Sequence, residues 1–201
     1  MRRVTIGQIV VLMKNLGTNI YRASLVSEKW KAPLGKLDPE TLMTTAENLL
    51  RAISRGPLED AIIFGAWDFS VNFDQRYDDA PCWQPHLYFV IATNVPELVL
   101  HKTLLSLVER APDIPIPKQI GKPRSLWRTV NYSLKTKFGR RERKIKNGEL
   151  NTCYDRLRSA ERRELAVVLH ELGVTGRLFM RGIKRSHWTF KFTRSVVSKN
   201  E

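Results

Sequence analysis

The sequence is poor in cysteine and histidine, with two and four residues among 201, and it has no long apolar run. Cys82 and Cys153 lack the spacing of a metal site and cannot form a disulfide framework, so we expect reduced thiols and a cytoplasmic protein. No apolar stretch reaches the roughly 18 residues that cross a bilayer. No small-residue cleavage site follows the basic start, so we expect no signal peptide and no membrane partner. The length suits one domain, or one domain with an appendage.

Acidic residues are also scarce relative to basic ones. The chain has 34 Lys and Arg against 20 Asp and Glu, which gives a formal net charge of +14. Such a balance predicts a polyanionic partner, most often nucleic acid, with an anionic membrane surface as the weaker alternative.

Two apolar runs, 61–73 and 83–92, dominate the middle of the chain. Both alternate between apolar and polar residues with a period of two, which predicts strands with one buried and one polar face. The loop between them, 74–81, is polar and ends in a proline, so a hairpin is the simplest arrangement. The polar face of that hairpin would carry Asp68, Asn72, His86 and Tyr88, and it is either solvated surface or a site.

The rest of the chain reads mainly as helix. Apolar spacing, caps and breakers predict helices over 4–16, 38–55, 94–110, 124–137 and 159–173. Residues 26–37 read as a connection, 111–121 as an extended segment or edge strand, and 177–183 and 188–197 as strands that form a second hairpin or extend the main sheet. We therefore expect an α+β fold: a central antiparallel β-sheet with flanking helices, plus a small C-terminal helix and β-hairpin.

Three short motifs occur in order along these elements. They are Phe69-Ser70-Val71-Asn72 on the first strand, Pro85-His86-Leu87-Tyr88 on the second, and Tyr132-Ser133-Leu134-Lys135 on the helix 124–137. Over roughly residues 61–138 this order resembles the HUH endonucleases, the tyrosine nucleases of rolling-circle replication initiators and related transposases and relaxases. His86 matches the first histidine of the family's His-hydrophobic-His motif, and Tyr88 stands where the second would be.

The resemblance implies a chemistry and a set of site residues. It implies that Tyr132 attacks a phosphate of single-stranded DNA, leaving a 5′-phosphotyrosyl enzyme and a free 3′-hydroxyl, and that Lys135 eases loss of the phenolic proton. It implies a divalent ion, Mn²⁺ or Mg²⁺, held by His86 with Asp68 or Asn72. The basic residues expected to contact nucleic acid are Arg124, Arg128, Lys137, Arg140, Arg141, Arg143, Lys144 and Lys146, with Tyr88 as a packing residue or a base-stacking platform.

Three regions follow from this interpretation. Residues 1–138 form the HUH-like nuclease and DNA-binding domain with an N-terminal helical extension, 139–158 a basic linker or loop, and 159–201 a C-terminal helix and hairpin packed on the same domain. The expected activity is nicking and joining of single-stranded DNA in replication initiation or mobilisation of a plasmid, phage or transposable element. A catalytically inactive relative that binds DNA and a basic RNA-binding protein are the alternatives.

Overall fold

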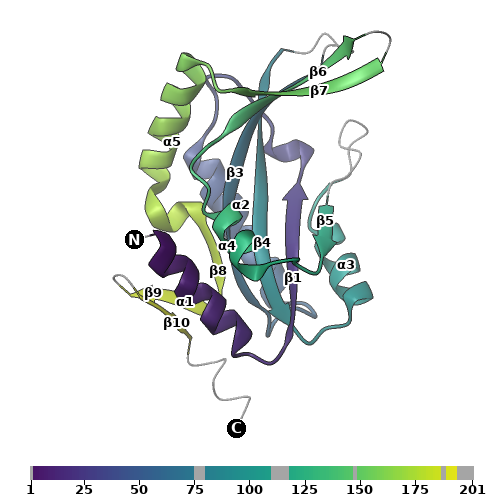
Figure 1. The fold of residues 1–201 in the computed structure, drawn as a ribbon, viewed down its shortest axis with the longest axis vertical. Coiled ribbons are helices and arrows are strands. Elements are labelled where there is room, and N and C mark those ends of the chain that lie inside the picture. The colour runs from purple at the N-terminus through teal and green to yellow at the C-terminus, as the bar shows by residue number, and fades with distance from the viewer. Residues whose placement is uncertain (1, 75–79, 110–117, 147–148, 187–188, 194–201) are drawn as a thin grey trace.

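The computed structural model describes residues 2–74, 80–109, 118–146, 149–186 and 189–193 (Figure 1). Its helices are α1 (Arg2–Lys14), α2 (Pro39–Ser54), α3 (Glu97–Ser106), α4 (Leu126–Ser133) and α5 (Ser159–Arg177), with a 3₁₀ turn at Glu28–Trp30. Its strands are β1 (Asn19–Val26), β2 (Ala32–Pro33), β3 (Ile62–Asp74), β4 (Cys82–Thr93), β5 (Lys118–Gly121), β6 (Gly139–Lys146), β7 (Glu149–Arg156), β8 (Leu178–Arg181), β9 (Ile183–Ser186) and β10 (Thr189–Phe192). The α+β expectation is confirmed.

The main sheet has the strand order β5-β1-β4-β3-β6-β7, with β2 paired to β4 and β8 paired to β3. Every pairing in it is antiparallel except that of β3 with β6, which is parallel. The succession β1-α2-β3-β4-α3-β5 gives the order β5-β1-β4-β3, which is the ferredoxin-like split βαβ arrangement. The helix α4 therefore follows the last strand of this unit and is free to cover the sheet face that α2 and α3 leave open.

The predicted hairpin of two long strands is present as β3 and β4. Their register pairs Asp68 with His86, so these two polar side chains lie side by side on one face. Gly65 pairs with Phe89 in the same ladder, and a Cβ atom built on it would lie 2.2 Å from the Phe89 Cβ. The close approach of these strands thus requires glycine at this position.

The two faces of the sheet are covered differently (Figure 1). On one face, Trp67, Phe69 and Phe89 belong to the large apolar core formed with α2, α3 and α5. On the other, Phe64 and Val90 belong to a second core beneath α1, α4 and the β9–β10 hairpin. Further along the same strands this second face becomes polar: it carries buried Asp68, Ser70, Gln84 and His86. The predicted polar face is therefore buried, and α4 reaches its border.

The interpretation of 139–158 as a linker or loop was wrong. Residues 139–146 form β6, which pairs with β3, and 149–156 form β7, which pairs with β6. The strand β6 is highly charged, but its Arg140 is buried and forms ion pairs with Glu142 and with Glu161 of α5. These ion pairs replace the apolar contacts that a strand usually buries. A run of charges was mistaken for a solvated segment because its partner lies on a distant helix.

Other element boundaries also differ from the sequence-based expectation. The strand β1 was not predicted, although it lies between β4 and β5 in the sheet. The helix α4 begins after Ser125, whose side chain accepts from the Arg128 N–H, and ends at Ser133, so Lys135 lies just beyond it. The strand β8 joins the main sheet and β9 pairs with β10; the part of the predicted strand 188–197 at Trp188 and beyond 193 lies outside the described residues. No helix among the described residues is long and apolar enough to cross a bilayer.

Candidate functional site

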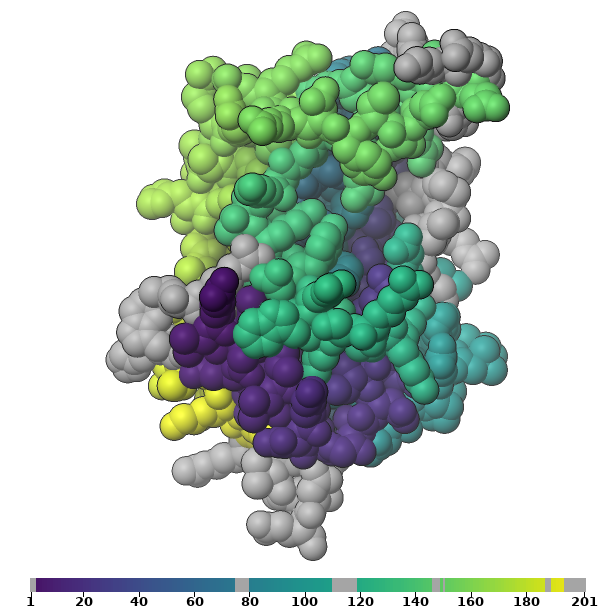
Figure 2. Space-filling model, in the orientation of Figure 1, coloured from purple at the N-terminus to yellow at the C-terminus, as the bar shows by residue number. Residues whose placement is uncertain are grey.

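A pocket of about 940 Å³ opens on the polar half of the sheet, beside α4. Figure 2 shows this face, with atoms of β1 and β3 recessed between α4 and the β6–β7 hairpin. Every strand from β5 to β6 of the sheet order lines the pocket: Arg22, Ser24 and Val26 of β1, Asp68 of β3, His86 and Tyr88 of β4, Gln119 of β5, and Arg141 of β6, together with Arg124, Ser125, Arg128, Thr129 and Tyr132 from α4 and the segment before it. The pocket thus collects residues from six elements, which run from β1 to β6 along the chain.

Tyr132, Asp68 and Lys135 form a compact cluster in and beside this pocket. The Tyr132 hydroxyl donates to Asp68 Oδ2 at 3.3 Å and accepts from Lys135 Nζ at 3.2 Å. Lys135 Nζ also lies 2.7 Å from Asp68 Oδ2. Asp68 Oδ1 is buried and has no hydrogen-bond partner within the part of the chain that the structure describes. The Tyr132 hydroxyl therefore lies between a carboxylate and an ammonium group. Because Tyr132 is 40% exposed, a ligand can still reach it.

His86 lies opposite Asp68 on the neighbouring strand and is buried. Its Nε2 is 3.3 Å from the Ser70 hydroxyl. Burial lowers the pKa of His86 to about 4; the positive charges of Arg141 and Lys135 act in the same direction, and Asp68 opposes them. The imidazole is therefore neutral near pH 7, which is the form that can donate a lone pair to a metal ion.

Tyr88 packs directly against Tyr132, with ring centroids 4.6 Å apart. Its hydroxyl hydrogen-bonds with Arg22 of β1 and Thr129 of α4. Burial raises the pKa of Tyr88 although these hydrogen bonds oppose the change, so the phenol is neutral. Tyr88 thus braces the ring of Tyr132 between the sheet and α4.

The residues named as metal ligands form an incomplete set. His86 and the unpartnered Asp68 Oδ1 are adjacent donors, whereas Asn72 Oδ1 accepts a hydrogen bond from Ser70 at 3.0 Å and Asn72 does not line the pocket. Among the described residues no three His, Cys, Asp or Glu side chains cluster as a metal site would require. Two donors suit an ion such as Mg²⁺ or Mn²⁺, which can complete its coordination with water and phosphate oxygens. The site therefore fits a divalent ion only as a two-ligand site.

The basic residues predicted to contact nucleic acid divide into three groups. Arg124, Arg128 and Arg141 line the pocket, as expected of an anion-binding surface. Lys137 is exposed and follows α4 in the sequence. Arg143 and Lys144 are paired with Asp74 and Glu142 respectively, and the side chain of Lys146 lies outside the described part. Arg140 was assigned wrongly: it is 3% exposed and its guanidinium is taken up by Glu142 and Glu161.

Sequence reasoning missed two arginines of this site. Arg22 lines the pocket on the unpredicted β1, and the alternation of buried Tyr21, Ala23 and Leu25 around it is the signal that could have revealed the strand. Arg177, the last residue of α5, donates to the backbone carbonyl of Lys135 and so holds the turn that carries it. No local pattern marks Arg177, because its partner is 42 residues away.

The charge of the pocket is one-sided. Among the described residues that line it, four are arginines, namely Arg22, Arg124, Arg128 and Arg141, and one, Asp68, is a carboxylate. Guanidinium groups favour phosphate, which each can bind through two parallel hydrogen bonds. The arrangement can therefore hold a phosphodiester beside a hydroxyl nucleophile.

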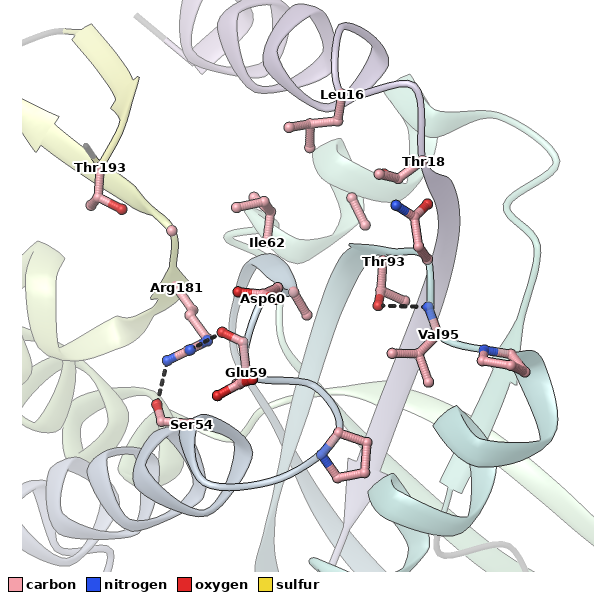
Figure 3. Close-up of a pocket in the computed structure, with 16 residues that line it drawn as sticks. Leu16, Thr18, Ser54, Glu59, Asp60, Ile62, Thr93, Val95, Arg181 and Thr193 are labelled. Carbon is pink, nitrogen blue, oxygen red and sulfur yellow. Dashed lines mark hydrogen bonds between the residues drawn. The ribbon is translucent and has the colours of Figure 1, made fainter. Parts of the chain in front are cut away.

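A second pocket of about 900 Å³ lies at the other end of the sheet (Figure 3). Arg181 is the one arginine among the described residues that line it, and its guanidinium donates to the Ser54 hydroxyl and the Glu59 carbonyl. These contacts tie β8 to α2 and the loop that follows it, so this arginine serves packing and not a site like that around Tyr132.

Comparison of the chain with protein-family models, with curated proteins and with solved structures finds no match.

Proposed function

We propose that the protein nicks and joins single-stranded DNA through a phosphotyrosine intermediate at Tyr132, in replication or mobilisation of a small genetic element in the cytoplasm. One observation carries the proposal: the Tyr132 hydroxyl is hydrogen-bonded to both Asp68 and Lys135 at the border of a pocket lined by four arginines. A nucleophile next to a base and a cation, with guanidinium groups for a phosphate, is the set of groups that transesterification at phosphorus needs.

The reaction balances with the residues present. As the Tyr132 oxygen forms a bond to phosphorus, the bond from phosphorus to the 3′-oxygen breaks, and that oxygen takes a proton from solvent. Asp68 accepts the proton that the phenol loses, because it already accepts the hydrogen bond from that hydroxyl. Lys135 offsets the charge that develops on the phenolic oxygen, and the reverse attack of a 3′-hydroxyl rejoins the strand.

His86 and Asp68 are the residues that would hold a Mn²⁺ or Mg²⁺ ion, and its chemistry would be to polarise the bound phosphate. The neutral state of His86 and the unpartnered Asp68 Oδ1 support this assignment. The arginines of the pocket would bind and orient the neighbouring phosphates, whether or not the ion is present.

A DNA-binding protein that does not cut is the second candidate. It is favoured by Tyr88, which stands in place of a second histidine and whose hydroxyl is engaged by Arg22 and Thr129. The ammonium group of Lys135 at 2.7 Å from Asp68 also competes with a cation for that carboxylate. Both features suit a pocket that binds phosphate without metal-assisted chemistry.

The test is formation of a covalent adduct. The protein is incubated with Mn²⁺ and a pool of random single-stranded DNA, and products are separated on a denaturing gel; we expect a DNA adduct that peptide mapping places on Tyr132. Tyr132→Phe removes only the hydroxyl, so the adduct disappears while DNA affinity persists. Tyr154→Phe is the matched control, since Tyr154 is an exposed tyrosine outside the pocket, and its adduct should form as in the wild type.

Three outcomes decide between the candidates. An adduct that survives in Tyr132→Phe shows that Tyr132 is not the nucleophile. Tight binding of single-stranded DNA with no adduct in any protein favours the non-cutting candidate. Tighter binding of RNA than of DNA of the same sequence, again without an adduct, supports an RNA-binding protein.

A further inference from the structure

The two faces of the β6–β7 hairpin carry different side chains. One face holds Arg140, Glu142 and Lys144 of β6, which are joined in ion pairs and connected to α5 through Glu161. The opposite face, by the alternation of a strand, carries Arg141, Arg143 and Ile145 of β6 and Thr152, Tyr154 and Arg156 of β7. The first face fixes the hairpin to the protein, and the second is turned the same way as the pocket.

Tyr154 is the most exposed large apolar side chain among the described residues, at 76%. It pairs with Arg141 across the two strands, and the Arg141 guanidinium carbon lies 5.9 Å from the centroid of its ring. Arg141 also lines the pocket. One arginine therefore connects the exposed aromatic ring to the site of Tyr132.

The hairpin lies at one end of the sheet, across the top of the view in Figure 1. The parallel pairing of β6 with β3, from Ser70–Gly139 to Asp74–Arg143, makes this surface a continuation of the pocket's own sheet face. The carboxylates of β6 and β7, namely Glu142, Glu149 and Asp155, fall by alternation on the other face. Asp74 of β3 meets this surface, where it pairs with Arg143. The surface thus combines an aromatic ring with arginines and lacks hairpin carboxylates.

We propose that the hairpin face formed by Arg141, Arg143, Tyr154 and Arg156 is a base-stacking platform for the single-stranded nucleic acid that flanks the reacting phosphate. The inference rests on the proposed function for the position of that phosphate and adds where the adjoining nucleotides bind. The Tyr154 ring stacks on an unpaired base, Arg141 spans the platform and the pocket, and Arg156 contacts the backbone.

An exposed ring with neighbouring guanidinium groups selects its partner. A base offers a flat face for stacking only when it is not already stacked within a helix, so a single strand is favoured over a duplex. The ring is thus the feature that specifies a nucleic acid strand.

The experiment separates stacking from charge. Fluorescence anisotropy measures binding of a labelled oligothymidylate of about 20 nucleotides, long enough to cover the 4 to 16 nucleotides that comparable binding surfaces occupy. An abasic oligomer of the same length has the same phosphates without bases. The measurements are made in EDTA on the Tyr132→Phe background, so that no covalent step contributes.

We expect Tyr154→Ala to weaken binding of the oligothymidylate about tenfold, as the loss of one stacked base predicts. The same change should leave binding of the abasic oligomer unaltered, and Tyr154→Phe should bind both as the parent does. Arg156→Ala should reduce the salt dependence of binding by roughly one phosphate contact. The control is Asn151→Ala, an exposed residue of β7 whose side chain falls on the opposite face.

The failure of this inference is distinct from the failure of the proposed function. If Tyr154→Ala binds the oligothymidylate as tightly as its parent, or weakens the abasic oligomer equally, there is no stacking platform, whatever the adduct test shows. If Tyr154→Ala weakens binding selectively but the wild type forms no adduct at Tyr132, the platform stands and the nicking reaction does not.

Discussion

The sheet carries a cluster of charged groups on each face, and the two clusters differ in how completely they are paired. On the α5 side, Arg140 bridges Glu142 and Glu161, and all four carboxylate oxygens have partners once Lys144 and the backbone N–H of Arg158 are included. On the pocket side, Asp68 Oδ2 accepts a hydrogen bond from the Tyr132 hydroxyl and pairs with the ammonium group of Lys135. Its Oδ1 has no partner among the described residues.

The innermost pair of the closed cluster is also more buried than any member of the open cluster. The side chains of Arg140 and Glu161 are each 3% exposed, whereas that of Lys135 is 23% exposed beside a pocket. Buried charges are tolerated when they are paired, and a buried unpaired carboxylate oxygen costs stability unless a ligand or water satisfies it. The closed cluster therefore serves the fold, and the open cluster is where a ligand is expected.

The largest effect that we predict breaks the closed cluster. Arg140→Ala leaves two buried carboxylates without their guanidinium partner, which should lower the free energy of unfolding by about 3–5 kcal/mol. Chemical denaturation followed by circular dichroism measures the change, with Arg163→Ala, an exposed residue of α5, as the control. A loss no greater than that of the control would show that the ion pairs are dispensable.

A second prediction breaks the open cluster without unfolding the protein. Lys135→Ala removes the ammonium group that contacts the Tyr132 hydroxyl, and adduct formation should slow by about 10²- to 10³-fold. The control is Lys102→Ala, an exposed lysine of α3 that does not line the pocket. Equal rates in the two variants would remove Lys135 from the reaction.

A third prediction concerns the arginines that line the pocket on the side of the open cluster. With about five phosphate contacts, affinity for single-stranded DNA should fall roughly 100-fold between about 50 and 200 mM salt. Replacing Arg22, Arg124 and Arg128 with alanine should reduce the slope of log affinity against log salt concentration by about two. An unchanged slope would place the strand elsewhere, whereas the Arg140→Ala protein, if folded, should keep the slope of the wild type.

The smallest effect sharpens the comparison by adding a donor to the open cluster. Tyr88→His places an imidazole next to His86 and should tighten Mn²⁺ binding about tenfold, with a preference over Mg²⁺ because imidazole suits the softer ion. Isothermal calorimetry measures the affinity, and Tyr88→Phe is the control that removes the hydroxyl without supplying a ligand. Absence of divalent binding in all three proteins would support the non-cutting candidate.

Much of this site was predictable because its parts have local signatures. The period-two alternation of 67–73 and 84–91 identified both long strands, and their pairing brought Asp68 next to His86 as expected. The apolar face of the helix around Val130 likewise left Tyr132 free to face the polar strands. Each of these inferences needed only residues within one element or its immediate neighbour.

The remainder depended on contacts that no local pattern reports. Arg140 and Arg141 are adjacent and chemically identical, yet one is buried against Glu161 and the other lines the pocket. Which of them is structural is set by the register of β6 on β3 and by a helix 21 residues away. The sequence therefore predicted that the segment was basic but not that half of it serves the fold.

One feature of the topology bears on how the chain is made. The outer edge of β3 is completed by two separate pieces: β6 pairs with its second half, and β8 pairs with Ile63–Ala66. Because β8 begins at Leu178, a ribosome must synthesise more than a hundred further residues before the first half of that edge can be covered. An unpaired edge of apolar residues is a site for pairing with other chains. Nascent or truncated chains that end before β8 are therefore expected to aggregate. Folding of the sheet in the cell must wait until the four residues of β8 have been synthesised.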